Sequence, residues 1–91
     1  MKISRSKNFE KSLRRVLSGG KVQIGDIENV IMLLAQSRKM PPKYKDHALL
    51  GEWKGYRECH IKPDLLLIYQ IHQDILVLVL IDIGSHAQLF G

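Results

Sequence analysis

Histidine is the residue of this sequence whose type and placement most readily suggest chemistry. The 91 residues include four histidines. His60 and Asp64 flank Pro63, which predicts a tight turn that keeps both side chains near one end of a strand. His47 ends a polar loop, and His86 lies just past an apolar segment, after Gly84 and Ser85. Because an ordinary histidine has a pKa of about 6.5, imidazoles beside a carboxylate suit proton transfer near neutral pH.

Such a set, without an activated nucleophile of its own, is suited to the cleavage of RNA. The RNA 2′-hydroxyl supplies the nucleophile, so the protein needs only a base, an acid and a cation for the phosphate. Ser85 lacks the context of a nucleophile elbow, and Cys59 alternates away from His60. The spacing of His47, His60 and His86 matches no familiar metal-ligand pattern.

The same side chains also have structural interpretations. A histidine at a strand end is commonly solvated or hydrogen-bonded, and His72, at an expected hairpin, is assigned to structure alone. Phe90 could stack on an RNA base or simply close the core near the C-terminus. Composition and periodicity alone predict no more than a small α+β domain that binds something acidic.

The first half of the chain is expected to form a short strand and two helices. Residues 2–4 suit the strand. Ser6 is a good N-cap for a helix whose apolar residues recur at i, i+4, i+7 and i+8 from Phe9, and residues 19–20, both glycine, end it. A second helix with a wide apolar face and an acidic start is expected over residues 26–36.

The second half is expected to form strands. After a loop over residues 37–48, alternation with period two predicts a strand over 53–61, followed by a turn at 62–64. Two strongly apolar strands are expected over 65–71 and 75–83. The predicted fold is an α+β domain with two N-terminal helices packed on an antiparallel sheet of about four strands. Two helices cannot cover both faces of such an apolar sheet, so a partner or a second copy is expected on the remainder.

Length and charge limit the possible functions. A chain of 91 residues predicts one domain over residues 1–91 and excludes a two-domain enzyme, a nucleotide-binding α/β fold or a barrel. The net charge of +5 is unevenly distributed. Residues 1–45 hold eleven Lys/Arg and three acids, net +8, whereas residues 46–91 hold three and six, net −3. This asymmetry indicates a surface that meets a polyanion, or else a solvated basic face.

The cellular setting is expected to be the cytoplasm. The single cysteine, Cys59, allows no internal disulfide and suggests a reducing compartment. The N-terminus lacks the apolar core of a signal peptide, and the longest apolar stretch, residues 65–83, is too polar in its middle to span a membrane. No membrane partner is expected.

Ordered motifs in residues 44–91 resemble those of a known protein family. They keep family-like spacing along the chain, whereas residues 1–43 match only in layout. The matching runs are Tyr44-Lys45-Asp46-His47 with Leu49, Gly51-Glu52-Trp53-Lys54-Gly55-Tyr56-Arg57, His60-Ile61-Lys62-Pro63-Asp64 leading into Leu67-Ile68-Tyr69, and Gly84-Ser85-His86-Ala87-Gln88-Leu89-Phe90-Gly91. The family is the YafQ-type branch of the RelE superfamily, the ribosome-dependent mRNA-cleaving toxins of bacterial type II toxin–antitoxin pairs.

The resemblance implies a RelE-like, microbial-ribonuclease-like fold and an endoribonuclease, or mRNA interferase, that cleaves mRNA in the ribosomal A site and inhibits translation. Its expected partners are the ribosome, mRNA and a cognate antitoxin that neutralises it. The family's acid–base set corresponds to His47, His60, Asp64 and His86. Phe90 is expected to position the substrate, and no cofactor or metal is implied.

Within this set, we expect His86 to be the acid and Asp64 with His60 to be base and orienting group, whereas the role of His47 stays open. The expected phosphate contacts are Lys45, Lys54 and Arg57, with a structural role as the alternative for Arg57.

A stripe of basic residues on the first helix is expected to dock on ribosomal RNA, unless it is merely a solvated face. The stripe consists of Lys7, Lys11, Arg14 and Arg15. Two other functions remain open: a non-catalytic module of the same fold that binds RNA, ribosomes or a partner, and a ribonuclease that needs no ribosome.

Overall fold

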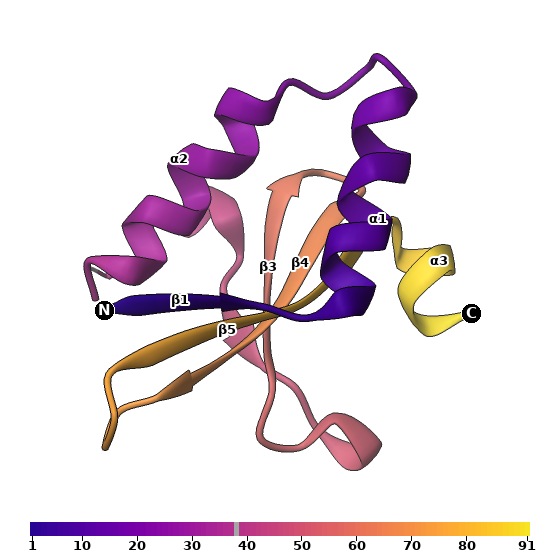
Figure 1. Ribbon diagram of the computed structural model, residues 1–91. Coiled ribbons are helices and arrows are strands. Elements are labelled where there is room, and N and C mark those ends of the chain that lie inside the picture. Colours follow the sequence, from indigo (N-terminus) through magenta and orange to yellow (C-terminus); the bar gives the residue numbers. More distant parts are fainter. Residues whose placement is uncertain (38) are drawn as a thin grey trace.

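The computed structural model describes residues 1–37 and 39–91, and in these residues five strands form one sheet in the order β1-β5-β4-β3-β2 (Figure 1). The strands are β1 (Lys2–Arg5), β2 (His47–Ala48), β3 (Arg57–Lys62), β4 (Leu65–His72) and β5 (Val77–Gly84). The helices are α1 (Lys7–Ser18), α2 (Ile24–Ala35) and α3 (His86–Phe90), with short 3-10 helices η1 (Pro42–Tyr44) and η2 (Gly51–Trp53). The expected α+β class with two N-terminal helices on a sheet is confirmed.

The sheet is mixed rather than antiparallel, and it has one strand more than expected. β1 pairs with β5 in parallel, from Lys2 opposite Val77 to Arg5 opposite Leu80, whereas the other pairs are antiparallel. A strand of four residues does not reveal its partner through its own pattern, so the parallel edge could not be predicted. The extra strand, β2, has only two residues and lies within the expected 37–48 loop, of which residue 38 is outside the described residues.

Helix α1 is joined to the last strand by its N-cap. The Ser6 hydroxyl accepts a hydrogen bond from the Phe9 amide at 2.9 Å and donates to the Ile81 carbonyl at 2.6 Å. Figure 1 shows α1 and α2 on the same side of the sheet. Phe9 from α1 and Ile27 from α2 are fully buried there, in a core that also contains Leu67 and Leu78. The predicted amphipathic faces of both helices are therefore confirmed.

The other face of the sheet is not the open apolar surface that the sequence led us to expect. Leu66 and Ile68 alternate away from the helix-side core, yet they are only 1% and 0% exposed. Large apolar side chains reach solvent elsewhere, at Leu50 and at the β4–β5 hairpin, where Ile75 and Leu76 are 64% and 59% exposed. A partner is therefore not required to cover the sheet itself.

Local backbone geometry shortens two of the predicted strands. Residues 53–56 do not continue β3, because η2 ends at Trp53 and Gly55 has a φ of 95°. Likewise β5 begins at Val77 rather than at residue 75, because Leu76 has a φ of 52° in the hairpin turn. Positive φ values interrupt extended backbone, and alternation of residue types alone does not detect them.

Helix α3 is an element that we did not predict. The Ser85 hydroxyl accepts a hydrogen bond from the Gln88 amide at 3.1 Å, and the Gln88 side chain accepts one from the Ser85 amide at 2.9 Å. This reciprocal pair is a capping box, and its Ser-x-x-Gln signature was readable in the sequence. In the part of the chain that the structure describes, no helix is long and apolar enough to cross a membrane.

Burial of the only cysteine leads to a testable prediction. Burial raises the pKa of the Cys59 thiol to about 12. We expect iodoacetamide at a pH of about 8.5 to alkylate Cys59 only after unfolding, because only the thiolate reacts. At pH values below the pKa of the thiol in the unfolded chain, Cys59 makes its full contribution to the free energy of unfolding. As the pH rises from there towards the folded pKa, the free energy of unfolding should fall, because the unfolded chain ionises first.

Mass spectrometry of native and urea-unfolded protein measures the first effect, and urea titrations across pH measure the second. In the Cys59→Ala variant, the part of the decrease in unfolding free energy at alkaline pH that comes from the thiol should disappear. Complete labelling of the native protein at the rate of the unfolded chain would contradict the prediction.

Candidate active site

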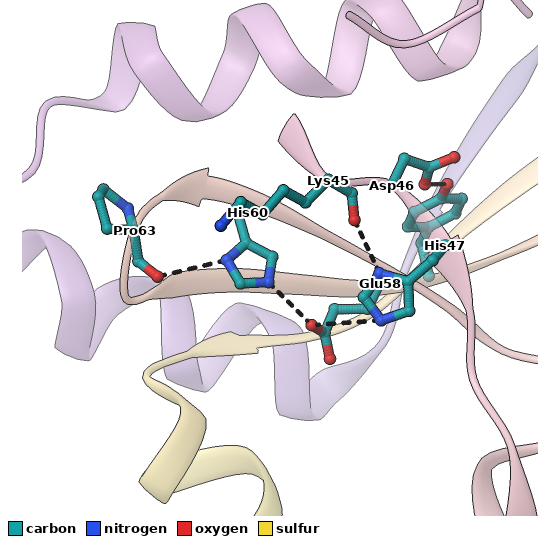
Figure 2. Close-up of polar contacts among 7 residues, drawn as sticks. Lys45, Asp46, His47, Glu58, His60 and Pro63 are labelled. Carbon is teal, nitrogen blue, oxygen red and sulfur yellow. Dashed lines mark hydrogen bonds and ion pairs between the residues drawn. The ribbon is translucent and has the colours of Figure 1, made fainter. Parts of the chain in front are cut away.

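A buried carboxylate lies between two of the predicted histidines. Glu58 and His60 are two residues apart on β3 and so share a face of the sheet, and His47 on β2 pairs directly with Glu58. Glu58 is 5% exposed, and its Oε1 atom lies 3.1 Å from His60 Nε2 and 3.8 Å from His47 Nε2. Figure 2 shows both rings directed at this carboxylate. Within residues 1–37 and 39–91, no cluster of three or more ligating side chains is placed to hold a metal ion.

Backbone carbonyls orient both imidazole rings. His47 Nδ1 is 2.7 Å from the Lys45 carbonyl oxygen, and His60 Nδ1 is 3.3 Å from that of Pro63 (Figure 2). Because a carbonyl oxygen only accepts, each Nδ1 is the donor, and each Nε2 is directed at Glu58. His60 Nε2 is within hydrogen-bond distance of the Glu58 carboxylate, as proton transfer requires, whereas His47 Nε2, at 3.8 Å, is close enough only for an ion pair.

Glu58 was not among the predicted site residues. The period-two alternation already assigned it to the same side of the strand as His60, and that was the signal that could have identified it. The predicted site therefore gains a carboxylate, which is the group that connects its two N-terminal histidines.

The remaining predicted acid–base residues, Asp64 and His86, meet at the end of the sheet. The Asp64 carboxylate, in the β3–β4 turn, accepts a hydrogen bond from the backbone amide of His86 at 3.0 Å. This contact brings together the turn and the C-terminal segment, whose proximity the sequence had only suggested. It uses the His86 backbone, so the exposed imidazole of His86 stays available.

Strand register determines how far apart the two groups are. Leu66 on β4 pairs with both His60 on β3 and Gly84 on β5, and His86 follows two residues later. Because β4 lies between β3 and β5, the backbones of β3 and β5 are two strand spacings, or about 10 Å, apart. His60 and His86 therefore lie on either side of the buried Leu66 side chain.

Phe90 packs at the edge of this arrangement. Its ring centroid is 5.2 Å from that of His86 and 5.7 Å from that of Trp53, the latter in an edge-to-face geometry. Trp53 in turn contacts Tyr56, with centroids 5.4 Å apart. Phe90 is half-buried, so it supports the His86 side chain and still presents part of its ring to solvent.

Arg57 lies on the opposite face of β3 from Glu58 and His60. Its Nη2 atom is 2.8 Å from Asp46 Oδ2 and its Nε atom is 3.3 Å from the Tyr69 hydroxyl, which also donates to Asp46. The hydrogen bond with Asp46 raises the pKa of Arg57, and burial raises that of Tyr69. These contacts favour a structural role for Arg57, because they hold Asp46, the residue that precedes His47. We call this set of contacts among Arg57, Tyr69 and Asp46 the clamp. Figure 2 shows Asp46 turned away from the Glu58 cluster.

The other expected RNA contacts are exposed cations. Lys45 and Lys54 are on the surface, as are all four residues of the α1 stripe, Lys7, Lys11, Arg14 and Arg15. Arg15 lines a cavity of about 500 Å³ together with Asp64 and Ser85. The C-terminal end of the stripe therefore reaches the end of the sheet where Asp64 and His86 meet.

Comparison with known proteins identifies the family of this chain. Residues 1–91 match the family model described as the bacterial toxin of type II toxin–antitoxin systems, YafQ. The chain belongs to this family. A putative toxin YafQ of Haemophilus influenzae is 46% identical over 72 residues, 77% of this chain and 71% of that protein. The mRNA interferase toxin YafQ of Escherichia coli K12 is 43% identical over 60 residues, 66% of this chain and 63% of that protein, just under two thirds of its length.

Membership of the YafQ family confirms the resemblance seen in the sequence. A chain in the crystal structure of the E. coli DinJ–YafQ toxin–antitoxin complex is 34% identical and has a TM-score of 0.87, with 98% of this chain and 96% of that chain covered. The RelE-like α+β fold is thus shown. The name of the E. coli relative, mRNA interferase toxin YafQ, gives the same class of enzyme that the sequence predicted, an endoribonuclease.

The clamp on Asp46 can be tested by truncating Arg57. Arg57→Ala should lower the free energy of unfolding by about 2 kcal/mol, because a half-buried carboxylate loses a charge-assisted hydrogen bond. Urea unfolding measures this loss. Amide chemical shifts of Lys45 and His47 should change in the same variant, because the clamp holds this segment.

Lys54→Ala serves as the exposed control and should change the stability by less than about 0.5 kcal/mol. If Arg57→Ala folds with unchanged stability and unchanged shifts at His47, Arg57 is not a clamp, and the phosphate contact becomes the better interpretation.

Proposed function

We propose that this chain is a ribosome-dependent endoribonuclease that cleaves mRNA in the A site and is neutralised by a cognate antitoxin. The observation that carries the proposal is that contacts join the predicted acid–base residues in two groups on neighbouring strands. One group runs from His47 through Glu58 to His60, and the other joins Asp64 to His86. Membership of the YafQ toxin family supports the same conclusion.

The proposed reaction uses the RNA's own nucleophile. A base removes the proton from the 2′-hydroxyl, and the oxygen attacks the adjacent phosphorus. The bond from phosphorus to the 5′-oxygen breaks, leaving a 2′,3′-cyclic phosphate, and an acid protonates the departing 5′-oxygen. Attack and departure occur on opposite sides of the phosphorus, so the base and the acid must face each other across it.

The geometry suggests how these roles are divided. The His60–Glu58 pair is the proposed base: the Pro63 carbonyl holds His60 Nδ1, so the proton of the 2′-hydroxyl is taken up between His60 Nε2 and the Glu58 carboxylate. His86 is the proposed acid on the other side of Leu66, and Asp64 orients it through the backbone amide. His47 contacts the same carboxylate as His60 and would stabilise its charge. Phe90, beside His86, is placed to stack on a base.

The α1 stripe fits docking on ribosomal RNA. Its four cations are exposed and make no ion pair with a residue that the structure describes. Binding through phosphates is salt-sensitive, since each neutralised phosphate releases counterions. An antitoxin bound over α1 and the neighbouring end of the sheet would block docking and cleavage together. The E. coli DinJ–YafQ complex supports a protein antitoxin as partner.

Replacement of the proposed acid tests the catalytic assignment. His86→Ala should leave thermal unfolding unchanged and lower the rate of mRNA cleavage on ribosomes by roughly 10²–10⁴-fold, because protonation of the leaving oxygen is lost. Mapping of 5′ ends after induced expression, and in a ribosome assay, measures the effect. His72→Ala, at the exposed β4–β5 hairpin, is the matched control and should cleave normally.

Each other outcome has a specific meaning. Normal cleavage by His86→Ala would refute the assignment of His86 as the acid. A wild-type chain that causes neither growth arrest nor in-frame cleavage would instead be a non-catalytic module. Cleavage of naked RNA at sites unrelated to codons would indicate a ribonuclease independent of the ribosome.

Charge reversal on α1 tests the docking surface. The double variant Lys11→Glu/Arg14→Glu should bind ribosomes more weakly, and the slope of log affinity against log salt should shrink by about one for each cation removed. Sedimentation with ribosomes across a salt series measures both. The control, Lys2→Glu/Lys39→Glu, makes the same change of charge on exposed residues outside the helix. Equal binding by the two double variants would exclude α1 as the docking surface.

A further inference from the structure

A second cavity opens beside His60, on the other side of the 62–64 turn from the Arg15 cavity. It has a volume of about 380 Å³ and lies between α2, η1 and the end of β3. β2 pairs only with Arg57 and Glu58, so the outer edge of β3 beyond them is left to this cavity rather than to another strand. The side chains that matter here are Asn29, Lys43, Tyr44, Lys45, His60 and Lys62.

Positive charge predominates in this cavity. Lys43, Lys45 and Lys62 all line it and all are exposed, and the one carboxylate in the lining, Asp26, is already paired with Lys62 at 3.2 Å. The ammonium of Lys43 lies 5.0 Å from the centre of the Tyr44 ring, which holds it at the cavity wall. Lysines placed in this way suit a phosphate group.

The cavity is larger than a phosphate needs, and it also offers neutral polar groups. Its volume falls within the range of roughly 300–1,000 Å³ typical of sites for small organic ligands. The Asn29 amide nitrogen is 3.4 Å from the Tyr44 hydroxyl, so the amide oxygen stays available to the cavity. An asparagine amide both donates and accepts, as needed to recognise the edge of an unpaired RNA base.

His60 belongs to both sites. Its ring contacts Glu58 and also lines the cavity, so a ligand there would lie next to the proposed general base. We propose that this cavity, the lysine pocket, binds one nucleotide of the RNA substrate next to the scissile phosphate. Lys43 and Lys45 contact its phosphate, and Asn29 contacts the edge of its base. This inference rests on the proposed ribonuclease function and specifies where a flanking nucleotide would bind.

Binding can be measured without cleavage. The probes are the four nucleoside 5′-monophosphates and, separately, inorganic phosphate, each titrated into the full-length ¹⁵N-labelled protein. Nucleotides should shift the amides of Asn29, Tyr44 and Lys45. Lys43→Glu should weaken their binding about tenfold, because an attraction becomes a repulsion, whereas Lys2→Glu on the far edge strand should leave it unchanged. Inorganic phosphate should bind more weakly than the nucleotides.

Several results would overturn the proposal. Shifts confined to α1, equal binding by Lys43→Glu and the wild type, or equal affinity for phosphate and nucleotides would each exclude a nucleotide site in the lysine pocket. If the Lys43→Glu protein does not fold, the Lys43→Gln variant is used in its place. This variant should bind nucleotides more weakly than the wild type, though with a smaller loss of affinity than Lys43→Glu. Unchanged affinity in Lys43→Gln would likewise exclude the lysine pocket as the nucleotide site.

Cleavage specificity gives a second test. Asn29→Ala should change the base preference at one position next to the cut, whereas Asn8→Ala, on the exposed side of α1, should not. An unchanged preference in Asn29→Ala would remove the base contact from the proposal. If the wild-type chain cleaves no RNA, the proposed function fails, but the binding results still decide whether the pocket takes nucleotides.

Discussion

The arrangement of the site depends on the burial of one carboxylate, that of Glu58. A carboxylate that is only 5% exposed is costly unless polar partners surround it. Here the partners are His60, on the same strand, and His47, on the neighbouring one. The pairing of the two-residue strand β2 with β3 places His47 beside Glu58, and this contact helps to offset the cost of burying the carboxylate. Glu58 also provides the proposed acid–base cluster with a carboxylate beside the two imidazoles.

Strand β3 separates two functions on its two faces. On one face, Glu58 and His60 form the proposed acid–base cluster; on the other, Arg57 holds Asp46, and Cys59 and Ile61 enter the core under the helices. Because Asp46 and His47 are adjacent, the clamp behind the sheet and the cluster in front of it act on the same short segment. The backbone that carries His47 is held from both sides.

Sequence reasoning predicted those parts of the fold that depend on local patterns. The apolar face of α1, its Ser6 cap and the apolar character of β4 were visible because each follows from spacing within a few residues. The parallel pairing of β1 with β5 was not, since it joins residues about 75 positions apart and leaves no local trace. In the site, motif resemblance predicted the histidines and Asp64 as acid–base residues, and their roles stay a prediction. Glu58 was missed as a member, and Arg57 was left with two interpretations, because the choice between the faces of β3 depends on tertiary contacts.

The pairing of the first strand with the last has a kinetic consequence. The β1 edge of the sheet and the bond from Ser6 to Ile81 both join residues near opposite ends of the chain. Contacts of such long sequence separation slow folding, because the entropy of closing the loop is lost before the pairing compensates for it. β5 also leads directly into α3, which carries His86 and Phe90. Pairing of the β1 edge should therefore be a late event in folding, whereas the contact between Asp64 and His86 depends only on the short connections of the β3–β4–β5 meander.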